Sequence, residues 1–159
     1  MTGRSPADDS RLTRAIRADV ATVYGLLAEV AFWPALFPHV RSARVLRRRG
    51  HQRLVAVRAT WRGLPVGWRA VQTLELEHGR VTFRHVNALS RGSSVCWSVE
   101  PTASGAHVSV TQQVHLHVPL VGTWISRHVL ESRIGPELAA AMLTRLQEIA
   151  EGGSLAGRS

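Results

Sequence analysis

Three polar side chains lie within segments of alternating apolar residues. At such positions they could face a buried site and take part in its chemistry. His85 ends the segment Val81-Thr-Phe-Arg-His85, and Gln72 and Gln112 lie in similar segments. A histidine among valine and phenylalanine could act as a general base or orient a ligand carbonyl. The favoured alternative is a core histidine hydrogen-bonded to a glutamine or to water. A glutamine transfers no proton near neutral pH, so Gln72 and Gln112 favour hydrogen bonding over catalysis.

No other pattern in the sequence predicts a catalytic or metal centre. His115 and His117 alternate with apolar residues on one predicted strand, but no third ligand of the right type lies nearby. Cys96 is the only cysteine, which excludes an intrachain disulfide and a Cys-rich metal site. Gly-rich phosphate loops, nucleophile elbows and dinucleotide fingerprints are absent. We therefore expect no cofactor and no metal, and His85 is the only candidate catalytic residue.

The charge of the chain bears on its partners. All twenty basic residues are arginine, and the net charge is +9, so polyanions such as RNA or anionic lipid headgroups stay possible. The arginines are scattered and do not interleave with aromatic residues on one strand, which argues against a nucleic-acid interface. The cluster Arg47-Arg48-Arg49 before Gly50 is typical of a solvated turn. Nucleic-acid binding is therefore the less favoured reading.

Hydropathy and length indicate one soluble domain. Its 159 residues fit a single core. No apolar stretch approaches the ~20 residues that cross a bilayer, and residues 1–20 lack the apolar region of a signal peptide. Cytoplasm is the default compartment, and the oligomeric state stays open. We expect the domain over 11–151 and frayed tails over 1–10 and 152–159.

The elements that would position the polar residues follow from periodicity. A strand is expected over 12–16, followed by a helix that Asp19 caps. The two prolines in the segment 32–39 limit it to a short turn. We expect this turn to bury its aromatic residues as a lid. A helical region follows from Pro119 to about 151, and Gly135-Pro136 should kink or split it. Between them, period-two patterns separated by turn signals predict an antiparallel meander. Its strands are expected at 40–49, 52–62, 66–77, 80–88, 93–101 and 106–117. This order predicts an α+β fold with about seven strands curved around the last helix.

Arginines set the expected orientation of the strands, because a buried unpaired guanidinium costs several kcal/mol. With Arg58, Arg69, Arg80 and Arg84 outward, the opposite phase faces the helix. Arg53 falls in that inward phase and counts against this register, unless it lies in the mouth of the turn. We expect a pocket between helix and sheet with Phe37 at its rim, where Trp68 and Trp97 could stack on a flat ligand or serve as core. The expected lining is Trp33, Phe37, Val57, Ala59, Trp68, Ala70, Gln72, Phe83, His85, Val95, Trp97, Val110, Gln112, Leu138 and Met142.

The chain resembles the START-like helix-grip superfamily, in its polyketide cyclase/dehydrase and coenzyme Q-binding branch. The residues that carry the resemblance include Ala21–Leu27, Phe32–Pro38, Val45-Leu46, Trp68, Val81–His85, Cys96-Trp97 and the region from Pro119 to Ala150. The aromatase/cyclases that the chain is similar to place a serine and an arginine two apart after a middle-strand tryptophan. Alignment on Trp68 puts Ala70 and Gln72 at those places, which puts ring-closing and dehydrating chemistry in doubt.

Three functions follow from this resemblance, and the chain could serve any of them because one fold hosts many activities. The first is a non-catalytic carrier or sensor of an isoprenoid, lipid or polyaromatic molecule. The second is a cyclase/dehydrase-type enzyme that uses the same cavity, with His85 as its remaining support. The third is an RNA- or ribosome-associated protein, as one similar bacterial branch implies. We favour the apolar small-molecule ligand.

Overall fold

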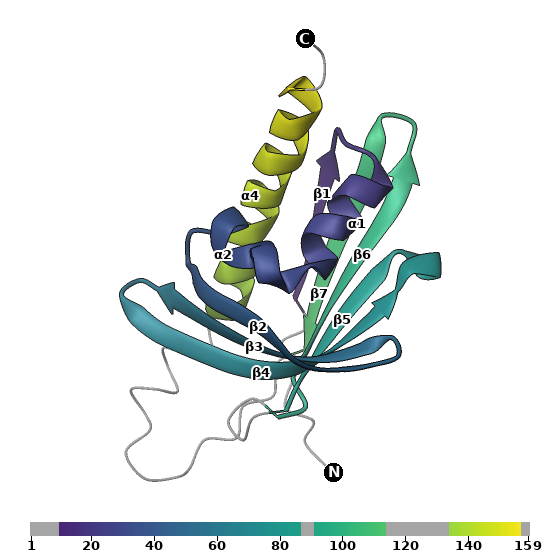
Figure 1. Ribbon diagram of the computed structural model, residues 1–159. Coiled ribbons are helices and arrows are strands. Elements are labelled where there is room, and N and C mark those ends of the chain that lie inside the picture. The colour runs from purple at the N-terminus through teal and green to yellow at the C-terminus, as the bar shows by residue number, and fades with distance from the viewer. Residues whose placement is uncertain (1–9, 87–90, 114–133, 157–159) are drawn as a thin grey trace, which may run out of the picture.

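A computed structural model describes residues 10–86, 91–113 and 134–156 of the chain. Figure 1 shows a curved antiparallel sheet with the helices α1, α2 and α4 on one side of it. The helical elements are α1 (Val20–Ala28), η1 (Val30–Phe32), α2 (Trp33–Leu36), η2 (Leu76–His78) and α4 (Ile134–Ala156). The strands are β1 (Ser10–Ile16), β2 (Val40–Arg49), β3 (Gln52–Trp61), β4 (Leu64–Glu75), β5 (Arg80–His85), β6 (Ser94–Thr102) and β7 (Gly105–Gln113). The expected seven-stranded helix-grip architecture is confirmed.

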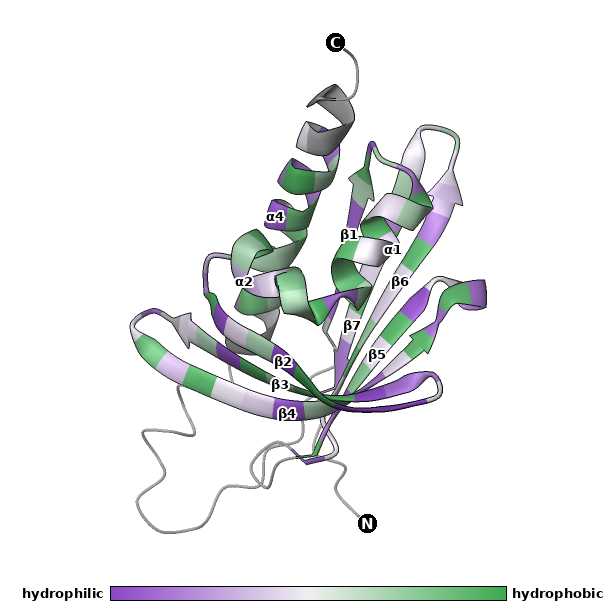
Figure 2. Ribbon diagram, viewed as in Figure 1, coloured by the Kyte–Doolittle hydropathy of each residue, from purple (hydrophilic) through white to green (hydrophobic). Residues whose placement is uncertain are grey.

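Strands β2–β7 form an antiparallel meander, and β1 pairs with β7 at one edge of the sheet. Its seven strands follow the order β1-β7-β6-β5-β4-β3-β2, and every neighbouring pair is antiparallel. Hydrophobic and hydrophilic residues alternate along the strands, as Figure 2 shows. Strand β2 forms one edge and carries five arginines, a composition that opposes edge-to-edge pairing with another sheet.

The β3–β4 connection is tighter than the sequence indicates. Arg62 and Gly63 form a two-residue turn, with φ angles of 50° and 79°, so Leu64 and Pro65 belong to β4 and not to the turn. Positive φ at both central residues matches the type I′ geometry that suits the twist of a hairpin. Pro65 is the second residue of β4, close to the strand start where a proline is tolerated.

Helix α1 begins where Asp19 caps it, as the sequence predicts. The Asp19 carboxylate accepts a hydrogen bond from the Thr22 backbone N–H at 3.4 Å. The Thr22 hydroxyl also donates to this carboxylate and holds the pKa of Asp19 below its usual value. Val23 and Leu27 are buried against the sheet, and the Tyr24 hydroxyl donates to the Arg80 carbonyl on β5 at 3.2 Å. The cap and the buried face fix α1 over the middle strands.

Helix α4 runs from the β3–β4 turn to the first strand. Near its start, the Glu137 carboxylate lies 3.0 Å from the Arg62 guanidinium. Near its end, Gln147 accepts from Arg14 at 3.0 Å and Glu151 accepts from the Arg17 backbone N–H at 3.1 Å. The buried stripe of the helix consists of Leu138, Ala139, Met142, Leu143, Leu146 and Ala150. The helix therefore closes the concave side of the sheet from one edge region to the other.

Gly135 and Pro136 lie in the first described turn of α4, and the expected kink or split there stays a prediction, because the residues before Ile134 lie outside the described part of the chain. Proline fits a first helical turn, where its missing N–H would have no intrahelical partner. The expected helical region between Pro119 and residue 133 lies outside the described residues, as do His115 and His117. None of the described helices is both long and apolar enough to span a membrane.

The aromatic segment after α1 packs differently from the expected lid. Phe37 is fully buried and Trp33 is 3% exposed, whereas Phe32 is 63% exposed. The indole N–H of Trp33 donates to the Leu26 carbonyl at 3.3 Å, which turns the ring inward. Phe32 ends a 3-10 turn, and the residue after it is the one that faces the core. The expectation that Phe32 is buried is therefore wrong.

Candidate functional site

The strands have the orientation that was expected from their outward arginines, which point away from the helices. Arg58, Arg69 and Arg84 are exposed, and the alternate residues of β3, β4 and β5 face the helices. Twelve of the expected lining residues are buried, at 0–8% exposure. They are Trp33, Phe37, Val57, Ala59, Ala70, Gln72, Phe83, Trp97, Val110, Gln112, Leu138 and Met142. The sequence therefore identifies the inward face, and burial divides it into packed and open parts.

The open part of the concave face is at one end of β4–β6. Trp68, His85 and Val95 face inward but are only partly buried. They lie close together because Ala70 pairs with His85 and Phe83 pairs with Val95 across the ladder. We call these three residues the open end. Partly exposed aromatic and apolar side chains on a concave face can contact a small molecule.

Trp68 and His85 stack at the open end. Their ring centroids are 6.0 Å apart and their planes differ by 1°. The two residues meet diagonally across β4 and β5, within the reach of large side chains in an antiparallel sheet. Burial lowers the pKa of His85 from 6.5 to about 4, because the charged imidazolium is poorly solvated there. At neutral pH the imidazole is thus uncharged and offers one donor and one acceptor.

Phe37 belongs to a packed aromatic cluster and not to a rim, which corrects the sequence expectation. The ring of Trp33 meets Phe37 edge-on, with centroids 5.7 Å apart and planes at 85°. Trp33 also contacts Phe83, with ring centroids 5.4 Å apart and planes at 53°. These geometries suit the aromatic quadrupoles. The cluster fastens the η1–α2 segment to the sheet.

A second polar position lies deeper on the concave face. Gln72 is fully buried, and its Nε2 donates to the Ala28 carbonyl at the end of α1, at 2.8 Å. Its Oε1 is also buried and has no hydrogen-bond partner among the described residues. An unsatisfied buried acceptor is uncommon in folded proteins. Gln72 therefore offers a free acceptor in a mostly apolar wall.

Arg53 occupies the inward phase because it has an acidic partner. It lies directly across the ladder from Gln72, and its guanidinium is 3.4 Å from the Glu29 carboxylate. The Arg53 side chain is 16% exposed, so the ion pair is partly shielded from solvent. Reasoning from the sequence missed this pair, because Glu29 lies after α1, far from Arg53 along the chain. The inward phase of Arg53 was the one signal that a partner existed.

The other expected site features are placed as follows. Ala70 and Gln72, which the sequence resemblance aligns with a serine and an arginine of the cyclases, are both buried on the concave face. Gln112 pairs with Val95 at the β6–β7 side of the open end. No group of three His, Cys, Asp or Glu residues suited to a metal occurs within 10–86, 91–113 and 134–156. The described face is thus mostly apolar, with neutral polar groups at a few positions and the Arg53–Glu29 ion pair beside Gln72.

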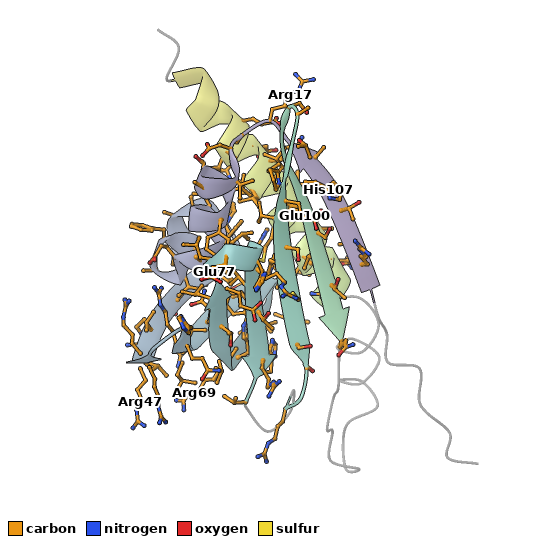
Figure 3. All side chains as sticks on the ribbon, turned by 90° about the vertical axis from the view of Figure 1, so that its right-hand side faces the viewer. Arg17, Arg47, Arg69, Glu77, Glu100 and His107 are labelled. Atoms are coloured by element: carbon orange, nitrogen blue, oxygen red, sulfur yellow. The ribbon has the colours of Figure 1, made fainter. Side chains whose placement is uncertain are left out.

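Arginines gather on the outer face of β2–β5, opposite the site. Exposed arginines project from four neighbouring strands, and residues 40–61 contain no aspartate or glutamate. They are Arg41, Arg44, Arg47, Arg58, Arg69 and Arg84. Figure 3 shows Arg47 and Arg69 extending from the same end of the sheet. We call this set the basic outer face.

Comparison with known proteins gives the family. Residues 16–141 match the family described as polyketide cyclase/dehydrase and lipid transport. The granaticin polyketide synthase bifunctional cyclase/dehydratase of Streptomyces virginiae is 33% identical over 135 residues, covering 81% of this chain and 43% of that protein. The chain thus spans less than half the length of this curated relative.

Solved structures show the same fold. A protein from Thermus thermophilus superposes with a TM-score of 0.76 at 23% identity, covering 95% of this chain and 99% of that one. The Zhui aromatase/cyclase from Streptomyces sp. R1128 superposes with a TM-score of 0.80 at 16% identity, covering 90% of this chain and 93% of that one. The match over residues 16–141 shows that the chain belongs to the polyketide cyclase/dehydrase and lipid transport family, and the solved structures show that it has the helix-grip fold.

Proposed function

We propose that this chain binds an apolar, ring-bearing small molecule at the concave face and acts as a carrier or sensor. The observation that carries the proposal is the open end, where Trp68 and His85 stack in parallel and stay partly exposed. A flat indole surface can take an aromatic ring by offset stacking, with a gain of ~0.5–1.5 kcal/mol beyond area burial. We place the protein in the cytoplasm, the default for a chain with one cysteine.

The chemistry of the surrounding wall supports binding over turnover. Ala70 and Gln72 stand where the similar cyclases carry a hydroxyl and a cation, and neither side chain moves a proton near neutral pH. The apolar neighbours Phe83 and Trp97 would exclude water from a bound ring. A few polar groups on such a wall orient a ligand, which is the usual composition of a binding site.

Native mass spectrometry tests this function. Protein purified from its own host is measured directly and again after extraction with organic solvent. We expect a discrete mass increment that disappears on extraction, and an apolar compound of that mass in the extract. A protein that has the mass of the bare chain in both measurements, and that binds none of a panel of fatty acids, isoprenoids and polyaromatic compounds, would contradict the proposal.

A second candidate function is cyclase/dehydrase-type catalysis at the same face. It is favoured by the 33% identity to a bifunctional cyclase/dehydratase, and His85, which its low pKa keeps unprotonated but makes a weak base, is its candidate general base. Turnover of the extracted compound by the purified chain, with loss of turnover in His85→Ala, would establish this candidate in place of the carrier.

The basic outer face supports a third and weaker association. Its arginines would attract polyanions through phosphate neutralisation, without the interleaved aromatic residues that hold single-stranded bases. We propose that any binding of RNA there is non-specific.

A further inference from the structure

Within the described part of the chain, only one of the two polar groups of the Gln72 amide has a hydrogen-bond partner, and this difference limits what a ligand can offer there. Its Nε2 donates to the Ala28 carbonyl at 2.8 Å, which fixes the orientation of the amide. The Oε1 on the other branch is buried without a partner among the described residues. An amide oxygen only accepts hydrogen bonds. A group that completes this site must therefore donate.

The surroundings of Gln72 indicate that the donor is neutral. The neighbouring cation, Arg53, is already paired with Glu29 at 3.4 Å. On the other side of Gln72 the ladder places Phe83, which is buried and apolar. An anion here would meet the amide oxygen without a free positive charge to balance it, and a cation would lose its hydration without a free negative charge.

We propose that the ligand of this chain carries a neutral hydroxyl or N–H group that donates to Gln72 Oε1 while its apolar rings lie against Phe83 and toward the open end. This inference rests on the binding function proposed above and narrows it to ring compounds with a donor. An arginine at position 72 would select the opposite polarity, because a guanidinium donates and cannot accept. The substitution that removes a cyclase feature thus changes what the site recognises.

Three probes that share a naphthalene ring test whether the ligand must donate a hydrogen bond. 2-Naphthol carries a hydroxyl that is neutral at pH 7, 2-methoxynaphthalene blocks it with a methyl group, and naphthalene lacks it. Fluorescence titration at pH 7 gives the dissociation constant of each. We expect wild type to bind 2-naphthol about 5- to 10-fold more tightly than 2-methoxynaphthalene, the effect of one net hydrogen bond.

Matched variants assign the preference to Gln72. Gln72→Met keeps the approximate shape and removes the acceptor, and we expect the two probes to bind it equally. Gln52→Met changes an exposed glutamine on the neighbouring strand β3 and should keep the wild-type preference. Naphthalene affinity and thermal unfolding report whether each variant keeps its fold. The wild-type comparison needs no variant and decides the matter if Gln72→Met does not fold.

The possible results separate this inference from the proposed function. Equal binding of 2-naphthol and 2-methoxynaphthalene by wild type, or a preference that survives in folded Gln72→Met, would overturn the donor requirement and leave apolar binding intact. No binding of any of the three probes would count against both.

Discussion

Trp68 and His85 lie in parallel planes, 1° apart in orientation, at the partly exposed end of the concave face. The stack places the one inward histidine of the described strands flat against an indole, and burial holds its pKa at about 4. An imidazole so placed is uncharged throughout the physiological range. It can accept or donate a hydrogen bond to a ligand without adding a charge to the apolar wall.

The pKa of His85 makes stability depend on pH. Its pKa is about 4 in the folded chain, against 6.5 for an unperturbed histidine, so between these values the unfolded state binds the proton more readily. The free energy of unfolding should therefore fall as pH drops from 6.5 toward 4, by at most about 1.4 kcal/mol per pH unit. Chemical denaturation across this range measures it.

The control for this pH effect is His85→Gln, which removes the titrating group. His39, whose pKa burial also lowers, and the carboxyl groups remain in both proteins and cancel in the comparison. We expect the difference in unfolding free energy between wild type and variant to change between pH 6.5 and 4. Parallel curves over that range would show that His85 stays solvated in the folded protein.

The carrier and enzyme readings differ in what His85→Ala changes. For a carrier, loss of one net hydrogen bond should weaken ligand binding by ~0.5–1.5 kcal/mol. For an enzyme with His85 as general base, turnover should fall by about 10²–10⁴ while binding persists. Calorimetry with the extracted compound, together with product analysis, distinguishes the two. We expect the small affinity change and no product from wild type.

Gly79 is required where β5 begins against β6. Its φ is 62°, and a Cβ at this position would overlap the Val99 carbonyl oxygen, a rigid backbone atom. Gly50 has nearly the same φ, 58°, with nothing within 4 Å of a Cβ. We expect Gly50→Ala to cost about 1 kcal/mol from the left-handed backbone alone, and Gly79→Ala to cost clearly more. Equal midpoints in urea for the two variants would contradict the close approach.

Most strands were predictable from the sequence because alternation and turn residues agree along most of the meander, the β3–β4 turn excepted. Strand β2 has the expected bounds, and the outward arginines give the phase of β3–β5. Arg53 is the exception to that phase, and its partner Glu29 is distant in the chain. A side chain whose partner comes from another element cannot be placed by periodicity.

Other parts of the candidate site depend on tertiary packing. The sequence put Trp68 and His85 on the same face, but their stack follows from the β4–β5 register, which the η2 turn and Gly79 determine. Phe37 was expected at a rim and is fully buried, because Trp33 turns inward and packs edge-on against it. Aromatic residues in a short segment that prolines interrupt have no period that separates core from rim.

Binding of RNA to the basic outer face should be weak and strongly dependent on salt. Association driven by phosphate neutralisation releases counterions, so the affinity should drop steeply from about 50 to 200 mM salt. Filter binding with several unrelated RNA sequences measures both salt dependence and specificity. Tight binding of one sequence, or of ribosomes, at physiological salt would promote the RNA-associated function over the carrier.

Adding an arginine to one face of β4 or to the other tests on which face the ligand binds. Trp68→Arg would bring an unpaired cation to the open end, whereas Thr73→Arg adds the same charge on the outer face of β4, between Gln52 and Thr82. An unpaired charge that a ligand must desolvate costs several kcal/mol. Thermal unfolding shows whether both variants keep their fold.

Calorimetric titration of the extracted compound into wild type, Trp68→Arg and Thr73→Arg tests the central claim most directly. We expect wild type and Thr73→Arg to bind with similar affinity, and folded Trp68→Arg to show no measurable binding. If folded Trp68→Arg binds the compound as tightly as wild type, the ligand does not occupy the concave face beside Trp68 and His85, and the account of this site is wrong.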